Sequence, residues 1–304
     1  MRRDTNILRC EEAAAILPVR LRKLVLALPD AQKAAVEEFR LRVGRPFTVL
    51  LPEGELALDA NVEPVELETL CDLATEFSRY AAAETIKEGF LAVRGGFRVG
   101  LCGTAVIKEG SNSNLKYFSG AAVRVAREMR GIGDALAIKL FDKGRFCSTL
   151  IVSPPGGGKT TLLRDLIRRL SDGVPGIGSS RVALVDERGE VAVMYRGEPQ
   201  MDVGTHTDVL EACPKALGIP MLLRAMNPQI IAVDEITQEK DLRAMSMAVG
   251  CGVGLLATVH GTDLADLERK PLYRSLLRQK TFDKVIFIRC TAGERSYEIE
   301  DLVT

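Results

Sequence analysis

Residues 153–161 form a glycine-rich stretch ending in lysine and two threonines, between an apolar run and a helix-like segment. Glycines let the backbone curl until successive N–H groups point at phosphate oxygens, and the following helix adds its positive N-terminal end. The stretch fits the pattern G-x-x-x-x-G-K-[ST] at every defined position except the first, which is Ser153. We therefore predict a nucleotide-binding loop formed by Pro155, Gly156, Gly157, Gly158, Lys159, Thr160 and Thr161.

Two acids at the end of a second apolar run complement this loop. Asp234 and Glu235 follow residues 230–233, a pattern typical of the metal-binding strand of nucleotide hydrolases. Lys159 would reach the β and γ phosphates, while Thr160 and Asp234 would hold Mg²⁺. Glu235 would accept a proton from the attacking water. The predicted ligands are therefore ATP and Mg²⁺.

Two further polar strand ends are candidates for the same crevice. Glu187 lies in the charged cluster 186–190, where it would position water or metal; the alternative is a solvated turn with a helix cap. His260 follows the apolar run 255–259, where it would sense the γ-phosphate; the alternative is a structural histidine.

Phosphoryl transfer also needs positive charge near the γ-phosphate, and an arginine from a neighbouring subunit often supplies it. Surface solvation is the alternative role for each arginine in this chain. The candidates for action in trans are Arg94, Arg98, Arg124 and Arg127.

Composition excludes several classes of protein. The chain has 304 residues, 46% of them hydrophobic, which suffices for two domains. Lys and Arg total 41, as do Asp and Glu, so no overall basic field attracts nucleic acid. The seven cysteines include no C-x-x-C pair, which favours reduced thiols in a cytoplasmic protein over a zinc site. Glycines interrupt the uncharged stretch 244–262, so we expect no membrane span but a cytoplasmic protein peripheral to a membrane.

The alternation of short apolar runs with helix-length segments after Cys147 predicts an α/β domain with a mainly parallel sheet. Ligands of such sheets bind at the carboxyl ends of the strands. The strands expected there are residues 148–152, 182–185, 230–233 and 255–259, with edge strands at 285–288 and 296–302.

The first part of the chain has a mixed pattern that predicts a smaller α+β domain. Residues 108–120, rich in Ser, Asn and Gly, are expected to form an exposed loop. The predicted domains are 1–130 and 131–304. Expected helices cover residues 11–28 and 65–78, and expected strands cover 39–51 and 90–107.

The order of several short motifs resembles one family. The glycine-rich stretch is followed by residues 185–190, 207–210, 213–215 and 224–228, and then by the acid pair. This order is similar to the stage III sporulation protein AA family, which belongs with the secretion-type ATPases of type II and type IV pilus machines.

The resemblance implies a RecA-like P-loop ATPase core preceded by the smaller N-terminal domain. It also implies a homo-hexameric ring in which N-terminal domains contribute arginines across subunit interfaces. The expected function is an ATP-hydrolysing motor on the mother-cell face of a membrane. There it would energise or assemble a membrane-embedded channel complex between mother cell and forespore.

Two other functions remain open. The arginines at positions 40, 42 and 45 would suit a nucleic-acid-binding, helicase-like P-loop ATPase. The balanced charge and the absence of tryptophan from the sequence disfavour stable nucleic-acid binding. A scaffold that binds ATP without hydrolysing it is the other alternative, disfavoured by the presence of the acid pair.

Overall fold

The computed structural model describes residues 4–80, 82–108, 110–125, 128–291 and 294–302. They fall into two units, Met1–Glu128 and Met129–Thr304, each with its own hydrophobic core.

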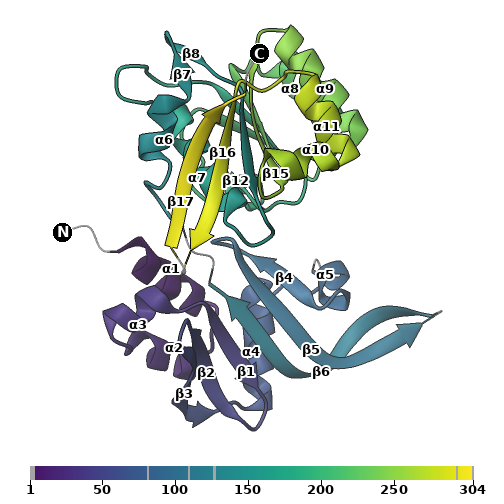
Figure 1. Ribbon diagram of the computed structural model, residues 1–304. Helices are drawn as coiled ribbons and strands as arrows, with labels where there is room; N and C mark the ends of the chain where they lie inside the picture. The colour runs from purple at the N-terminus through teal and green to yellow at the C-terminus, as the bar shows by residue number, and fades with distance from the viewer. Residues whose placement is uncertain (1–3, 81, 109, 126–127, 292–293, 303–304) are drawn as a thin grey trace. The chain divides into compact units, whose positions relative to one another are not determined.

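The N-terminal unit contains one six-stranded sheet, in the order β3-β2-β1-β6-β5-β4, with antiparallel neighbours throughout (Figure 1). Its helices are α1 (Thr5–Ala14), α2 (Val19–Leu26), α3 (Asp30–Ala35), α4 (Pro64–Ala74) and α5 (Ala83–Lys87). Its strands are β1 (Glu38–Arg42), β2 (Pro46–Leu51), β3 (Gly54–Asn61), β4 (Phe90–Val93), β5 (Phe97–Lys108) and β6 (Ser111–Arg124).

Alternation along β1 shows how this sheet obtains two different faces. Phe39 and Leu41 are fully buried in the core against helical residues, whereas Arg40 and Arg42 are partly exposed. Successive side chains of a strand point to opposite faces, so the arginines share the face away from this core.

The structure corrects two expectations for this unit. The expected loop at 108–120 is wrong, because most of it belongs to β6, which pairs with β5 along nearly its whole length. Ladder hydrogen bonds to β5 outweigh the weak strand propensity of Ser, Asn and Gly. The expected helix at 11–28 is two helices, because Pro18 lacks the N–H needed to continue α1 into α2.

The C-terminal unit alternates strands and helices. Its helices are α6 (Asp134–Lys139), α7 (Lys159–Asp172), α8 (Lys215–Ala225), α9 (Glu239–Gly250), α10 (Leu264–Arg269) and α11 (Pro271–Arg278). The strands of its large sheet are β9 (Thr149–Ser153), β10 (Val182–Asp186), β13 (Thr207–Glu211), β14 (Ile230–Val233), β15 (Gly254–His260), β16 (Lys284–Thr291) and β17 (Glu294–Asp301). Two small hairpins pair β7 (Phe141–Asp142) with β8 (Arg145–Phe146) and β11 (Met194–Tyr195) with β12 (Glu198–Pro199).

The large sheet has the order β13-β10-β14-β15-β9-β16-β17. Every neighbouring pair is parallel except β16 and β17. The prediction of a mainly parallel sheet is therefore confirmed. Strands β9, β10 and β14 are buried at every residue, as continuous apolar runs must be when helices cover both faces.

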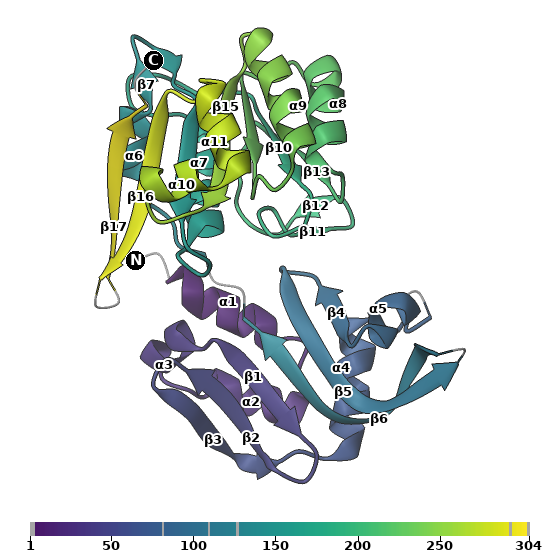
Figure 2. The same cartoon turned by 45° about the vertical axis from the view of Figure 1, so that its right-hand side comes forward.

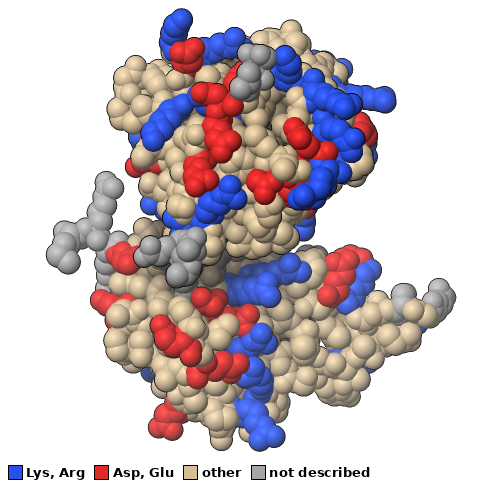
Figure 3. All heavy atoms as spheres, viewed as in Figure 1, with Lys and Arg blue, Asp and Glu red and all other residues tan. Residues whose placement is uncertain are grey.

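Helices α8, α9 and α11 cover one face of this sheet and contribute to one hydrophobic cluster. Helices α6 and α7 cover the other face and contribute to a second cluster (Figure 2). On the face shown in Figure 3, basic and acidic side chains are interspersed over the C-terminal unit. The balanced charge of the sequence is thus also mixed locally on this surface.

Candidate functional site

The carboxyl ends of three adjacent strands bring the predicted residues together. Strand β15 lies between β14 and β9, and its last residue, His260, pairs with Ser153 at the end of β9. Asp234 and Glu235 directly follow β14. The polar residues therefore meet at one edge of the sheet, as expected for an α/β fold.

The glycine loop, residues 154–158, joins β9 to α7 and relies on backbone conformations that glycine favours. Gly156 has a φ of 74° and Gly158, which precedes the first helical residue, a φ of 97°. A Cβ atom at Gly157 would lie 1.8 Å from Ser153 Oγ. Gly158 ends the loop as the N-cap of α7. The N–H groups of the first helical turn favour an anion at this position.

Lys159 is buried at the start of α7. Its Nζ donates to the carbonyl oxygens of Ser153 and Pro154, each at 3.0 Å, and lies 2.9 Å from His260 Nδ1. Burial lowers the pKa of Lys159 from its usual 10.5, although Asp234 and Glu235 act in the opposite direction. The ammonium is therefore held in place without a carboxylate in direct contact.

His260 connects this lysine to Glu235. A charged Lys159 must donate to Nδ1, which places the ring proton on Nε2, and Nε2 lies 2.7 Å from Glu235 Oε1. Arg188 Nη1 donates to Glu235 Oε2, so both carboxylate oxygens have a partner.

The hydroxyl groups of two threonines hold Asp234. Thr160 Oγ1 donates to Oδ2 at 2.8 Å, and Thr258 Oγ1 donates to Oδ1 at 2.5 Å. Thr258 Oγ1 also accepts the N–H of Glu235 at 2.8 Å. Glu235 has a φ of 54°, so Thr258 supports a left-handed backbone conformation at this residue.

Lys159, Thr160, Asp234, Glu235 and His260 line one cavity of about 510 Å³, large enough for part of a nucleotide. The lining residues are Pro155, Gly156, Gly158, Lys159, Thr160, Thr161, Arg188, Glu190, Asp234, Glu235, His260 and Arg295. Gly157 lies in the same loop.

Glu187 is placed elsewhere. Its carboxylate accepts a hydrogen bond from Lys215 Nζ at the start of α8, and it does not line the cavity. The preceding Asp186 accepts the N–H groups of Glu190, Val191 and Ala192, so it shapes the turn. The structure therefore does not bring Glu187 together with the other predicted residues.

Sequence reasoning missed three residues of the site: Arg188, Thr258 and Arg295. Arg188 lies in the charged cluster 186–190, where the neighbouring acids match a metal- or water-positioning role and the arginine does not. Thr258 and His260 are two residues apart on β15 and therefore point to the same face of the sheet. This spacing is a signal in the sequence for Thr258. Arg295 Nε lies 3.1 Å from where a Cβ on Gly158 would be, and nothing near Arg295 in the sequence announces this contact.

The candidate trans arginines belong to the N-terminal unit. Arg94 is exposed in the turn between β4 and β5, and Arg98 stacks on Phe90 with its guanidinium carbon 4.2 Å from the ring centre. Arg124 is exposed, with Nε 3.5 Å from Glu38 Oε2. Arg127 lies outside the described residues.

The donor atoms near the loop suit Mg²⁺. The Thr160 hydroxyl and the Asp234 carboxylate are hard oxygen ligands on adjacent elements, and Mg²⁺ commonly takes only one or two such groups besides water and phosphate. Within the described ranges, no group of three or more His, Cys, Asp or Glu residues is arranged to hold a metal. A Mg²⁺ ion held by Thr160 and Asp234 would take its remaining ligands from water and phosphate.

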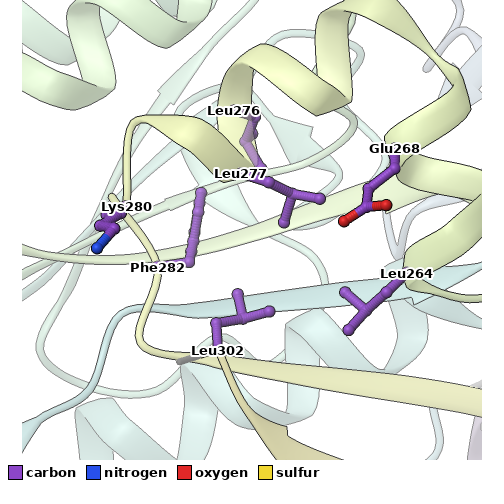
Figure 4. Close-up of a pocket in the computed structure, with 7 residues that line it drawn as sticks. All are labelled: Leu264, Glu268, Leu276, Leu277, Lys280, Phe282 and Leu302. Carbon is purple, nitrogen blue, oxygen red and sulfur yellow. The ribbon is translucent and has the colours of Figure 1, made fainter. Parts of the chain in front are cut away.

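A smaller hollow of about 150 Å³ lies beside α10 and α11. Its walls are mainly leucine, together with Phe282, Glu268 and Lys280 (Figure 4). None of the residues predicted for catalysis lines it.

Comparison with solved structures defines the class of fold. The ATPase DotB of Legionella pneumophila matches with a TM-score of 0.60 over 93% of this chain and 80% of that one, at 15% identity. The pilus retraction motor PilT, solved with bound ADP, matches with a TM-score of 0.58 over 88% and 80%, at 18% identity. The chain therefore has the fold of the RecA-like secretion ATPases.

Sequence comparison identifies the particular family. The family model for sporulation stage III, protein AA, matches residues 8–297. The stage III sporulation protein AA of Bacillus subtilis is 34% identical over 282 residues, covering 93% of this chain and 92% of that protein. This chain belongs to the sporulation stage III protein AA family.

Proposed function

We propose that the protein hydrolyses ATP in the cavity at the carboxyl ends of β9, β14 and β15. The observation that supports this most directly is the convergence of Lys159, Thr160, Asp234, Glu235 and His260 on that cavity. The solved secretion ATPases with the same fold support the same assignment.

In this proposal each side chain has a defined task. The N-terminal N–H groups of α7 and the Lys159 ammonium bind the β and γ phosphates. Thr160 and Asp234 hold Mg²⁺, which would neutralise charge on the phosphates. Glu235 takes a proton from the water that attacks the γ-phosphorus. His260 donates to Glu235 through Nε2 and accepts from Lys159 through Nδ1, so it fixes the two side chains relative to each other.

The proposal extends to an assembly. We infer a homo-hexameric motor that energises or assembles a membrane-embedded channel complex between mother cell and forespore. Arg94, Arg98, Arg124 and Arg127 are the candidates for supplying charge to a neighbouring subunit's site. Family membership and the secretion-ATPase fold support this role.

A cytoplasmic location against the mother-cell face of the membrane belongs to the same proposal. Among the described helices, none combines the length and apolarity that a membrane crossing requires.

Two of the three arginines that would suit a nucleic-acid-binding protein, Arg40 and Arg42, form ion pairs within the N-terminal unit. Arg42 donates to both oxygens of Glu55 at 3.0 Å, and Arg40 and Arg124 both pair with Glu38. Nothing in the described part of this unit favours nucleic-acid binding over the motor proposal.

Light scattering with and without a non-hydrolysable ATP analogue, paired with an ATP turnover assay, tests the proposal. We expect the analogue to increase the mass toward six subunits and the protein to release phosphate from ATP. A monomer at every analogue concentration would contradict the ring, and absence of turnover from an assembled ring would contradict the hydrolase.

A further inference from the structure

Arg188 follows β10, and its side chain contacts Glu235, which follows β14. Its side chain is 58% exposed, whereas that of Glu235 is 21% exposed. Its Nη1 donates to Glu235 Oε2, and its Nε lies 3.5 Å from Glu190 Oε1. The arginine therefore approaches the cavity from the rim with its charge directed at the proposed base.

This pairing restrains Glu235. Its other oxygen accepts from His260 Nε2 at 2.7 Å, so donors of the protein occupy both oxygens. In this arrangement an attacking water would have to compete with two protein donors for the Glu235 carboxylate.

A bound triphosphate offers Arg188 a stronger partner. Arg188 lines the same cavity as Lys159, Thr160 and Arg295, and its exposed side chain can turn without movement of the backbone. A terminal phosphate carries more negative charge than a carboxylate and accepts two parallel hydrogen bonds from a guanidinium. A nucleoside diphosphate lacks the γ-phosphate.

We propose that Arg188 is a positioning residue that senses the terminal phosphate. In the empty site it holds Glu235, and when a nucleoside triphosphate binds it moves to the γ-phosphate and frees Glu235 for the attacking water. The inference rests on the proposed function and adds a means by which the site distinguishes ATP from ADP.

The test measures equilibrium affinity for two probes, ADP and a non-hydrolysable ATP analogue, both with Mg²⁺. Arg188→Ala should lower affinity for the analogue about tenfold while ADP affinity stays within about twofold. Glu235→Gln weakens the competing pair and should tighten analogue binding, and this gain should vanish in the double variant. Arg278→Ala, which removes an exposed arginine on α11, is the matched control and should change neither affinity.

The outcomes separate this inference from the proposed function. If the wild type binds neither probe, the proposed function fails and the inference fails with it. If the wild type binds both but Arg188→Ala leaves the ratio of the two affinities unchanged, the inference alone is overturned. A gain from Glu235→Gln that persists without Arg188 would also overturn it.

Discussion

Ser153 Oγ occupies the space that a side chain on Gly157 would need, since a Cβ atom there would lie 1.8 Å from it. Ser153 stands where the glycine-loop pattern has its first glycine, so the departure from the pattern is accommodated inside the loop. A side chain at position 157 is therefore expected to be tolerated only when Ser153 is replaced by a smaller residue.

Gly157→Ala should lower ADP affinity roughly tenfold or more, because the new methyl group forces the loop out of its curled conformation. Ser153→Gly alone should change affinity little, and the double variant should recover most of the loss. Isothermal titration with ADP and Mg²⁺ measures all three. If Gly157→Ala and the double variant lose equal ADP affinity, the contact with Ser153 is not the cause of the loss.

Removing the Thr258 hydroxyl should affect both acids at once. Thr258→Val leaves a partly buried carboxylate oxygen and a backbone N–H without this partner, at a cost of about 1–3 kcal/mol in the free energy of unfolding. Turnover should fall about tenfold or more because Asp234 and Glu235 lose their common support. Denaturant unfolding and steady-state turnover test this, with Thr258→Ser as the control that keeps the hydroxyl. Equal behaviour of the two variants would contradict this role.

The lowered pKa of Lys159 predicts a pH dependence. Because its pKa is lower in the folded than in the unfolded chain, the folded state binds fewer protons, and this group makes the free energy of unfolding rise with pH up to 10.5. ADP affinity should change in the opposite direction, falling as pH rises toward 10.5, since only the ammonium form attracts phosphate.

Lys159→Arg is the matched control for this pH dependence. A guanidinium stays protonated across that range, so whatever affinity the variant retains should not show the additional decline. Parallel curves for the wild type and the variant would mean that another group titrates.

The parts of the site that sequence predicted are those encoded locally. Lys159 and Thr160 follow the glycines directly, and Asp234 and Glu235 follow an apolar run, so their placement needs only a strand, a turn and a helix. Arg295 lies on β17 and reaches the loop only after β16 has paired with β9. No local pattern carries that information.

Neighbouring charged residues show the same limit. Glu187 and Arg188 are adjacent, yet one pairs with Lys215 and the other with Glu235, because the turn after β10 directs them differently. In the N-terminal unit, residues 108–120 are loop-like in composition, but pairing with β5 makes most of them a strand. In both cases contacts with other elements determine the structure, and local composition contains no information about those contacts.

The central claim is that Glu235 activates water for attack on a triphosphate held by Lys159. Steady-state phosphate release and equilibrium binding of a non-hydrolysable ATP analogue, measured on the wild type and Glu235→Gln, test it most directly. Glu239→Gln, an exposed glutamate in the first turn of α9, is the control. The account predicts that Glu235→Gln binds the analogue at least as tightly as the wild type while turnover falls about 10²- to 10⁴-fold. Wild-type turnover in Glu235→Gln would contradict it.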